Sequence, residues 1–278
     1  MAKRTDSTTE AEVIRLYQQG MSTSKIAEQL GMWQPTAYNI VKRSGIEMRS
    51  TSEANARYLR DEHVFDEINT EDAAYWLGFI AADGTVRKEA LKITLSGVDV
   101  GHLQKFAAWI SPSRPVHEEQ MKGRTKTICT IKIGSQYLVQ QLASFGIMPN
   151  KTYIMKELPV LHQHPIMNDF LMKHWLRGYV DGDGYISSAR NRNGTRNRIE
   201  ITAYSKELLS EIQERFVQAT GAGSVSILPN HDRAWRYVKC GKEVRRIVNY
   251  LYGDATIYLD RKYQLAMEIL KTDEGYAL

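Results

Sequence analysis

The chain has 278 residues, 42% hydrophobic and 25% charged, which is the balance of a folded soluble protein with room for two or three domains. The net charge is +5, no apolar run is long enough to span a bilayer, and no apolar segment follows the first residues, so neither a membrane span nor a secretory signal is expected. The two cysteines, Cys129 and Cys240, stand outside any Cys/His cluster. We therefore expect no disulfide framework and no zinc site, and a reducing intracellular compartment such as the cytoplasm or nucleoid.

Residues 9 to 43 have the pattern of three short helices, separated at Gly20 and Gly31; the third is expected to run from about Gln34 to Arg43, with Pro35 in its first turn. The segment GMSTSKIAEQLGMWQPTAYNIVKRSG resembles resolvase-like and homeodomain-like helix-turn-helix units, whose last helix enters the major groove. We therefore expect residues 1–45 to bind DNA; a helical hairpin that only packs on another part of the protein is the alternative. The side chains expected to face bases or phosphates are Gln34, Thr36, Tyr38, Asn39, Lys42 and Arg43.

Residues 46–69 are mainly polar and charged and are interpreted as a linker. The remainder of the chain contains an internal repeat. WLGFIAADG, ending at Gly84, aligns with LRGYVDGDG, ending at Gly184, so that Asp83 and Asp183 are 183 − 83 = 100 positions apart. Helical and strand-like segments follow in the same order in both copies.

The repeat predicts an α+β fold of two pseudo-symmetric αββαββα units, residues 70–158 and 159–278, after a small all-α domain. The strands expected in the first unit are 85–86, 91–95, 116–119 and 128–133. Those expected in the second are 185–188, 199–203, 224–228 and 235–240. The helices expected between and after the hairpins are 100–110, 136–145, 206–220 and 242–250.

Small residues are spaced four apart in both motifs, at Gly78 and Ala82 and again at Gly178 and Gly182. Residues at this spacing lie on one face of a helix, and faces without bulky side chains let two helix backbones approach closely. Gly78 and Gly178 are therefore the expected points of helix packing. The glycine that follows each aspartate is expected to end its helix in the left-handed conformation.

Two close-packed helices that end at the same level would bring Asp83 and Asp183 together. Each carboxylate would then stand at the negative end of a helix dipole and beside another carboxylate. A divalent cation such as Mg²⁺ relieves both effects, and it can activate water for phosphodiester hydrolysis. An isolated Asp-Gly after a helix is usually only a cap and turn, but two copies within matching repeats favour a site.

The two motifs, together with FGIMPNKTYIM and YLDRKYQLA, resemble the LAGLIDADG homing endonucleases over about residues 70 to 270. The resemblance implies that the last acid of each motif binds the catalytic metal, Mg²⁺ or Mn²⁺, with help from the preceding carbonyl groups. The metal ligands so implied are Asp83, Asp183, Ala82 and Gly182.

The family also places a basic catalytic residue near each metal site. Lys151 is the candidate in the first repeat, whereas Arg261 and Lys262 both fit in the second, and the sequence does not choose between them. Asp181 matches an earlier acid of the motif, but the first copy has Ala81 there, so no essential role is assigned to Asp181.

The resemblance implies two four-stranded sheets that form a saddle over the major groove, where a two-stranded ribbon fits. Basic residues gather in three of the expected hairpin loops, and arginine pairs well with guanine edges. The expected DNA-contacting residues of the repeats are Lys122, Arg124, Lys126, Arg190, Arg192, Arg196, Arg198, Arg233 and Arg236.

Two motifs in one chain imply a monomer acting on a long, asymmetric site in double-stranded DNA. The leading hypothesis is a metal-dependent, site-specific double-strand DNA endonuclease of the kind that mobilises introns. The chain shows no initial Cys or Ser and no terminal His-Asn of an intein, so a freestanding or intron-encoded protein is expected. The alternatives are a cleavage-inactive DNA-binding regulator or RNA maturase on the same scaffold, and a structural DNA-bridging protein.

Overall fold

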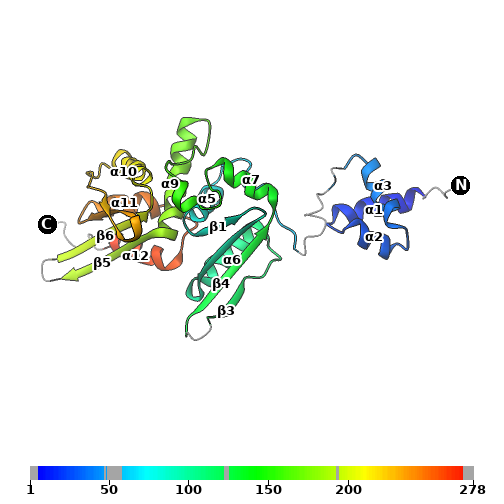
Figure 1. The fold of residues 1–278 in the computed structure, drawn as a ribbon, viewed down its shortest axis with the longest axis horizontal. Coiled ribbons are helices and arrows are strands. Elements are labelled where there is room, and N and C mark those ends of the chain that lie inside the picture. The colour runs from blue at the N-terminus through cyan, green and yellow to red at the C-terminus, as the bar shows by residue number, and fades with distance from the viewer. Residues whose placement is uncertain (1–5, 47, 49–57, 122–124, 192–193, 272–278) are drawn as a thin grey trace. The chain divides into compact units, whose positions relative to one another are not determined.

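The computed structural model describes residues 6–46, 48, 58–121, 125–191 and 194–271, with only the backbone of 190–191 and 194–195 (Figure 1). The chain forms two compact units. One contains the described residues up to Arg60 together with Ser111–Arg114, and the other contains Asp61–Ile110 and the described residues from Pro115 onward. No helix in the described part of the chain combines the length and apolar character needed to cross a membrane.

The smaller unit is a three-helix domain with its own apolar core around Val13, Ile26 and Ile40. Ser22 and Asp6 cap the second and first helices by accepting hydrogen bonds from backbone amides, as serine and aspartate do at helix starts. The third helix has the predicted bounds, whereas the first begins two residues earlier than expected. The helices are α1 (Ser7–Gln18), α2 (Thr23–Gln29) and α3 (Gln34–Arg43).

The larger unit contains the two predicted repeats. The elements of the first are α5 (Glu71–Asp83), β1 (Gly84–Arg87), β2 (Ala90–Ser96), η1 (Gly97–Asp99), α6 (Val100–Ile110), β3 (His117–Gln120), β4 (Thr127–Gly134), α7 (Gln136–Ser144) and α8 (Lys151–Ile154). Those of the second are α9 (Pro165–Asp183), β5 (Gly184–Asn191), β6 (Gly194–Ala203), α10 (Lys206–Thr220), β7 (Leu228–Pro229), η2 (His231–Arg233), β8 (Trp235–Cys240), α11 (Val244–Tyr252) and α12 (Asp260–Lys271).

Each repeat forms one antiparallel four-stranded sheet, in the orders β1-β2-β4-β3 and β5-β6-β8-β7. The equivalent strands therefore occupy equivalent places, which confirms the predicted α+β repeat. Helices α5 and α9 pack side by side between the two sheets (Figure 1). The buried apolar residues of both repeats form one continuous core, so the two repeats are a single folded unit.

The structure of the larger unit differs from the predicted elements in the following ways. Phe65 and Ile68, assigned to the linker, are buried in the core of the larger unit. The strand expected at 224–228 is reduced to the two residues of β7; within the expected range, the Val225 amide donates to the side chain of Gln213 instead of to a neighbouring strand. Helices α8 and α12 were not among the expected elements.

Candidate active site

Helices α5 and α9 touch through their backbones at two glycines. A methyl group on Gly78 would lie 2.0 Å from the carbonyl oxygen of Trp175, and a methyl group on Gly178 would lie 2.0 Å from that of Tyr75. Because the repeat offset is 100 positions, these two contacts are the same contact related by the pseudo-two-fold axis. The pair of glycines thus fixes both the distance between the helices and their relative register.

This register brings the two helix ends together. A methyl group on Gly182 would lie 2.3 Å from the Cβ atom of Ala82 and 3.4 Å from a carboxylate oxygen of Asp83. Asp83 and Asp183 are the last residues of α5 and α9, so the structure places their carboxylates at the common end of the pair.

The expected left-handed conformation after each aspartate is wrong. Gly84 and Gly184 are extended, with φ of −69° and −89°. Glycine is required there for a steric reason: a Cβ atom would lie 2.6 Å from the carbonyl oxygen of Ile80, or 2.5 Å from that of Val180. The chain therefore passes from each helix directly into the first strand of its sheet.

The surroundings disfavour the charged form of both aspartates. Asp83 is half-buried and Asp183 reaches solvent, but dense protein surrounds both carboxyl groups and displaces much of their hydration. This desolvation, followed by the charge of Asp83, raises the pKa of Asp183 to about 6. Desolvation also raises the pKa of Asp83, although Lys262 and Lys151 act in the opposite direction. The carboxylates are thus held together at some electrostatic cost, which a bound cation would offset.

One lysine lies at the end of each helix. Lys151, at the start of α8, donates a hydrogen bond of 2.7 Å to the carbonyl oxygen of Ala82. Lys262, in the first turn of α12, donates to four carbonyl oxygens at the end of α9, those of Val180, Asp181, Gly182 and Gly184. Cations near helix C-termini are favourable. Both amines are buried, which lowers the pKa of Lys151 and lowers that of Lys262 to about 8.

The structure distinguishes the two basic candidates of the second repeat. Lys262 is the counterpart of Lys151, whereas the Nε atom of Arg261 donates to Asp99 of η1 at 3.0 Å. Arg261 therefore forms an ion pair at the contact between the repeats, which favours Lys262 as the basic residue of the second half, although the charge of Arg261 also acts to lower the pKa of Asp83. The side chain of Arg261 is 53% exposed and Asp99 is buried.

Asp181 also differs from expectation. It is fully enclosed and accepts hydrogen bonds from the hydroxyls of Tyr75 and Tyr252 and from the Leu259 amide. It is thus not simply a dispensable counterpart of Ala81. No local sequence pattern indicates this network, because its members are separated by 71 to 106 positions.

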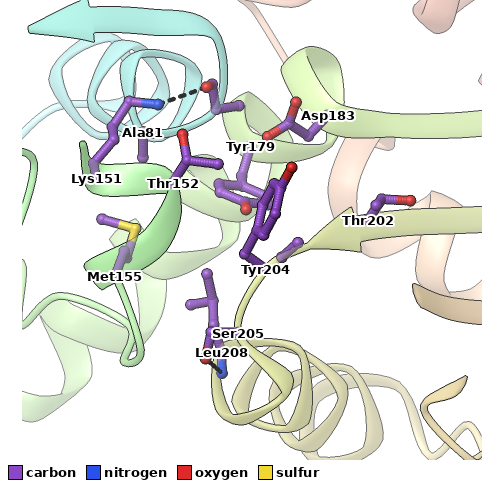
Figure 2. A pocket seen from close by; sticks show the side chains of 12 residues that line it. Ala81, Lys151, Thr152, Met155, Tyr179, Asp183, Thr202, Tyr204, Ser205 and Leu208 are labelled. Carbon is purple, nitrogen blue, oxygen red and sulfur yellow. Dashed lines mark hydrogen bonds between the residues drawn. The ribbon is translucent and has the colours of Figure 1, made fainter. Parts of the chain in front are cut away.

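A pocket of about 170 Å³ lies beside Asp183 and is lined by both repeats. Figure 2 shows Lys151 and Thr152 on one side and Thr202 and Tyr204 on the other. The hydroxyl end of Tyr204 points toward the side of the pocket where Asp183 lies (Figure 2). The pocket gives solvent and small groups access to one of the two carboxylates.

The donor set at the helix ends fits a hard divalent cation. Two carboxylates and the nearby carbonyl groups of Ala82 and Gly182 are the oxygen ligands that Mg²⁺ prefers. In the part of the chain that the structure describes, no three acidic, histidine or cysteine side chains cluster as a metal site. A cation bound here would therefore depend on the two aspartates, with water or substrate oxygens completing its coordination.

The predicted DNA-contacting residues of the repeats fall into three groups. Lys126, Arg196 and Arg233 are exposed. Arg198 and Arg236 are half-buried, and Arg198 forms an ion pair with Glu200. Outside the described residues lie Lys122, Arg124 and Arg192, and the side chain of Arg190.

In the smaller unit, the predicted contact residues lie on α3. Gln34, Tyr38, Asn39 and Lys42 are exposed, whereas Thr36 is half-buried. The exposed Arg43 forms an exposed ion pair with Glu10 of α1 and donates to the carbonyl of Asn39. The opposite face, formed by Ala37, Ile40 and Val41, is buried in the core, as predicted.

Comparison with known families agrees with both motifs. Residues 4–47 match the homeodomain-like domain family, and residues 171–218 match the LAGLIDADG-like domain family. The chain thus carries a homeodomain-like domain followed by a LAGLIDADG-like domain, and the resemblance inferred from the sequence is confirmed. The matched part of the second domain contains most of α9 with Asp183, all of β5 and β6, and most of α10.

Among curated proteins, the replication factor C small subunit of Methanocaldococcus jannaschii is 27% identical over 163 residues, 57% of this chain. The match spans only 8% of that protein's length.

Solved structures that are similar to this chain include two LAGLIDADG endonucleases and a WhiA protein. The LAGLIDADG meganuclease I-AabMI bound to uncleaved DNA is 11% identical, with a TM-score of 0.45 and coverage of 70% of this chain and 87% of that one. The I-LtrWI LAGLIDADG homing endonuclease bound to target DNA is 12% identical, with a TM-score of 0.45 and coverage of 76% and 92%. Full-length DUF199/WhiA from Thermatoga maritima is 17% identical, with a TM-score of 0.44 and coverage of 77% and 66%.

Proposed function

We propose that this protein is a site-specific double-strand DNA endonuclease that hydrolyses phosphodiester bonds with a divalent cation, Mg²⁺ or Mn²⁺. The observation that carries the proposal is the pairing of Asp83 and Asp183 at the common end of α5 and α9, with Lys151 and Lys262 beside them. Acids whose surroundings disfavour the charged form are costly for stability, and functional sites are where such costs are tolerated.

The residues of the site have separate tasks. The carboxylates of Asp83 and Asp183 would hold the cation, which when bound supplies an activated water and stabilises the leaving oxygen. The buried amines of Lys151 and Lys262 place positive charge near the phosphate, where negative charge develops during the reaction. Water adds to phosphorus and one P–O bond breaks, which leaves one phosphate end and one hydroxyl end.

The rest of the chain would recognise the DNA. Lys126, Arg196 and Arg233 are exposed at hairpins of the sheets, and α3 of the smaller unit has an exposed polar face. Because the two repeats differ in these side chains, a single chain would read a long, asymmetric site as a monomer. Such an enzyme would open DNA at the insertion site of a mobile intron, the role that the family resemblance implies.

A cleavage-inactive DNA-binding regulator, or an RNA maturase, is the alternative on this scaffold. The smaller unit supports DNA binding equally under the regulator alternative and the enzyme proposal, so it does not separate them. The paired aspartates favour the enzyme, since binding alone does not require two desolvated carboxylates at the common end of two helices.

The test begins with purified full-length protein and a library of random duplex DNA. Sequences retained by the protein in Ca²⁺ are recovered and then incubated with protein and Mg²⁺, and new ends are mapped by sequencing. We expect double-strand breaks at one position. Asp83→Asn and Asp183→Asn should bind the selected DNA but not cut it, whereas Asp169→Asn, an exposed acid of the same helix α9, should cut normally.

Specific binding by the wild-type protein without any cleavage would exclude the enzyme and leave the regulator. Retention of RNA but not duplex DNA would favour the maturase. Normal cutting by both Asn variants would show that the catalytic site lies elsewhere.

A further inference from the structure

Helix α9 carries a buried polar stripe that α5 lacks. His174, Arg177 and Asp181 are spaced three and four residues apart, so they lie on one face of α9, and each is at most 2% exposed. The repeat offset of 100 assigns each of them an apolar counterpart on α5: Ala74, Leu77 and Ala81. The two central helices are therefore equivalent in backbone packing but different in what they bind along this face.

Arg177, in the middle of the stripe, binds the end of α11 and the segment that follows it. Arg177 donates through Nε to the carbonyl of Ile257 at 2.9 Å and through Nη1 to that of Leu251 at 3.1 Å. Its third contact is the carboxylate of Glu71 on α5, at 2.5 Å, which also accepts from the Thr256 amide. The segment from 251 to 257 is thus fixed to α9 and to the first turn of α5.

Asp181 fixes the next part of this segment. Its carboxylate accepts hydrogen bonds of 2.7 Å from the hydroxyls of Tyr75 and Tyr252, and one of 2.8 Å from the Leu259 amide. The carbonyl of Leu259 in turn accepts the first-turn hydrogen bond from the Lys262 amide at 2.9 Å. Asp181 therefore anchors the start of α12, the helix that carries Lys262 to the end of α9.

Lys151 is held in place by fewer contacts than Lys262. It begins α8, a single turn of four residues that follows Asn150 in the left-handed conformation, with φ of 64°. Its amine has one carbonyl partner, that of Ala82, whereas the amine of Lys262 has four. At the position equivalent to Asp181, Ala81 offers no carboxylate that could anchor the turn before Lys151.

We propose that Asp181 is a positioning residue for Lys262, and that the half of the site containing Lys262 is more preorganised than the half containing Lys151. A buried carboxylate with three donors holds its partners in one geometry. The catalytic consequence rests on the proposed endonuclease function: the two DNA strands are cut at unequal rates, the faster one by the Lys262 half.

The first experiment needs no cleavage. Full-length protein is treated with a small amine-acylating reagent, and modification of each lysine is followed by peptide mass spectrometry. In Asp181→Asn, labelling of Lys262 should rise about tenfold through easier local opening, with labelling of Lys151 unchanged. The matched control is Asp254→Asn, which changes an exposed acid of the same segment and should alter neither rate.

If Asp181→Asn does not fold cooperatively, Tyr252→Phe removes one donor and should produce the same selective change in smaller size. If the labelling rate of Lys262 stays at the wild-type value in the folded variant, the proposal is overturned. An equal rise at Lys151 and Lys262 also overturns it, since it indicates general loosening rather than positioning.

The second experiment follows each strand of the selected DNA separately. We expect Asp181→Asn to slow cleavage of the same DNA strand whose cleavage Lys262→Met slows. Cleavage of the strand that depends on Lys151, as judged by Lys151→Met, should keep its rate. Adding Asp181→Asn to Lys262→Met should have no further effect. Equal slowing of both strands overturns the proposal, whereas a wild-type protein that cuts neither strand refutes the proposed function and leaves the labelling result to decide the role of Asp181.

Discussion

Gly78 approaches Trp175 so closely that a methyl group on the glycine would lie 2.0 Å from the Trp175 carbonyl oxygen. No side-chain rotation relieves a contact with backbone, so Gly78→Ala must push α5 and α9 apart. We expect a loss of unfolding free energy of about 3 kcal/mol or more, the upper range for overpacking in a core. Denaturant unfolding measures it. Gly101→Ala in α6 is the control, because nothing lies within 4 Å of its added methyl group and stability should rise slightly.

Binding of a divalent cation should stabilise the fold through the two aspartates. A ligand at one hundred times its dissociation constant adds about 2.7 kcal/mol, so Mg²⁺ should raise the melting temperature of the wild-type protein measurably. The double variant Asp83→Asn, Asp183→Asn should be more stable than wild type in EDTA, since mutual repulsion is removed, and should not respond to Mg²⁺. The same rise in both proteins would place the cation elsewhere.

The stability of the larger unit should fall in acid partly through His174. Its Nδ1 atom accepts a hydrogen bond from Arg177, and burial, followed by the charges of Arg177 and Lys173 against those of Glu71 and Asp254, lowers its pKa to about 4. In the unfolded chain the pKa of a histidine is near 6.5. The contribution of His174 to the unfolding free energy is therefore fully present above pH 6.5 and is lost as the pH falls toward 4.

His174→Asn keeps an acceptor for Arg177 but does not titrate. Unfolding free energies of wild type and variant, measured from pH 7.5 to pH 4, should therefore diverge below pH 6.5, with the wild type declining more steeply. Parallel pH profiles would show that His174 is not responsible.

Lys42 and Arg43 on α3 should contribute to DNA affinity by binding phosphates. Removing one basic side chain from a phosphate reduces the slope of log affinity against log salt by about one, so Lys42→Gln with Arg43→Gln should reduce it by about two. A fluorescence titration at several salt concentrations measures the slope. Arg15→Gln on α1 is the control, because the Arg15 guanidinium is already paired with Glu12 at 2.6 Å, and it should leave the slope unchanged. If the control lowers the slope as much per charge as the α3 variant does, the effect reflects only the general charge of the protein.

Local sequence patterns were sufficient to predict most of the fold. Helix α3 has the predicted bounds because Gly31, Pro35 and the apolar spacing all mark it locally, and the repeat identified Asp83 and Asp183 because the two copies align without a gap at the motif. The choice between Arg261 and Lys262 could not be made in this way. These neighbours point in different directions, one to Asp99 and one to the end of α9, and only long-range packing determines which is which.

The polar stripe of α9 restricts how the two halves can be exchanged. Besides its partners within the second half, the stripe has two partners across the helix pair, Tyr75 for Asp181 and Glu71 for Arg177. In a symmetric dimer built from two copies of the second half, these partners would be replaced by Trp175 and Leu171, which offer neither a hydroxyl nor a carboxylate. Asp181 and Arg177 would each lose one of the partners that they have in this chain, so the second half is adapted to pair with the first half rather than with a copy of itself.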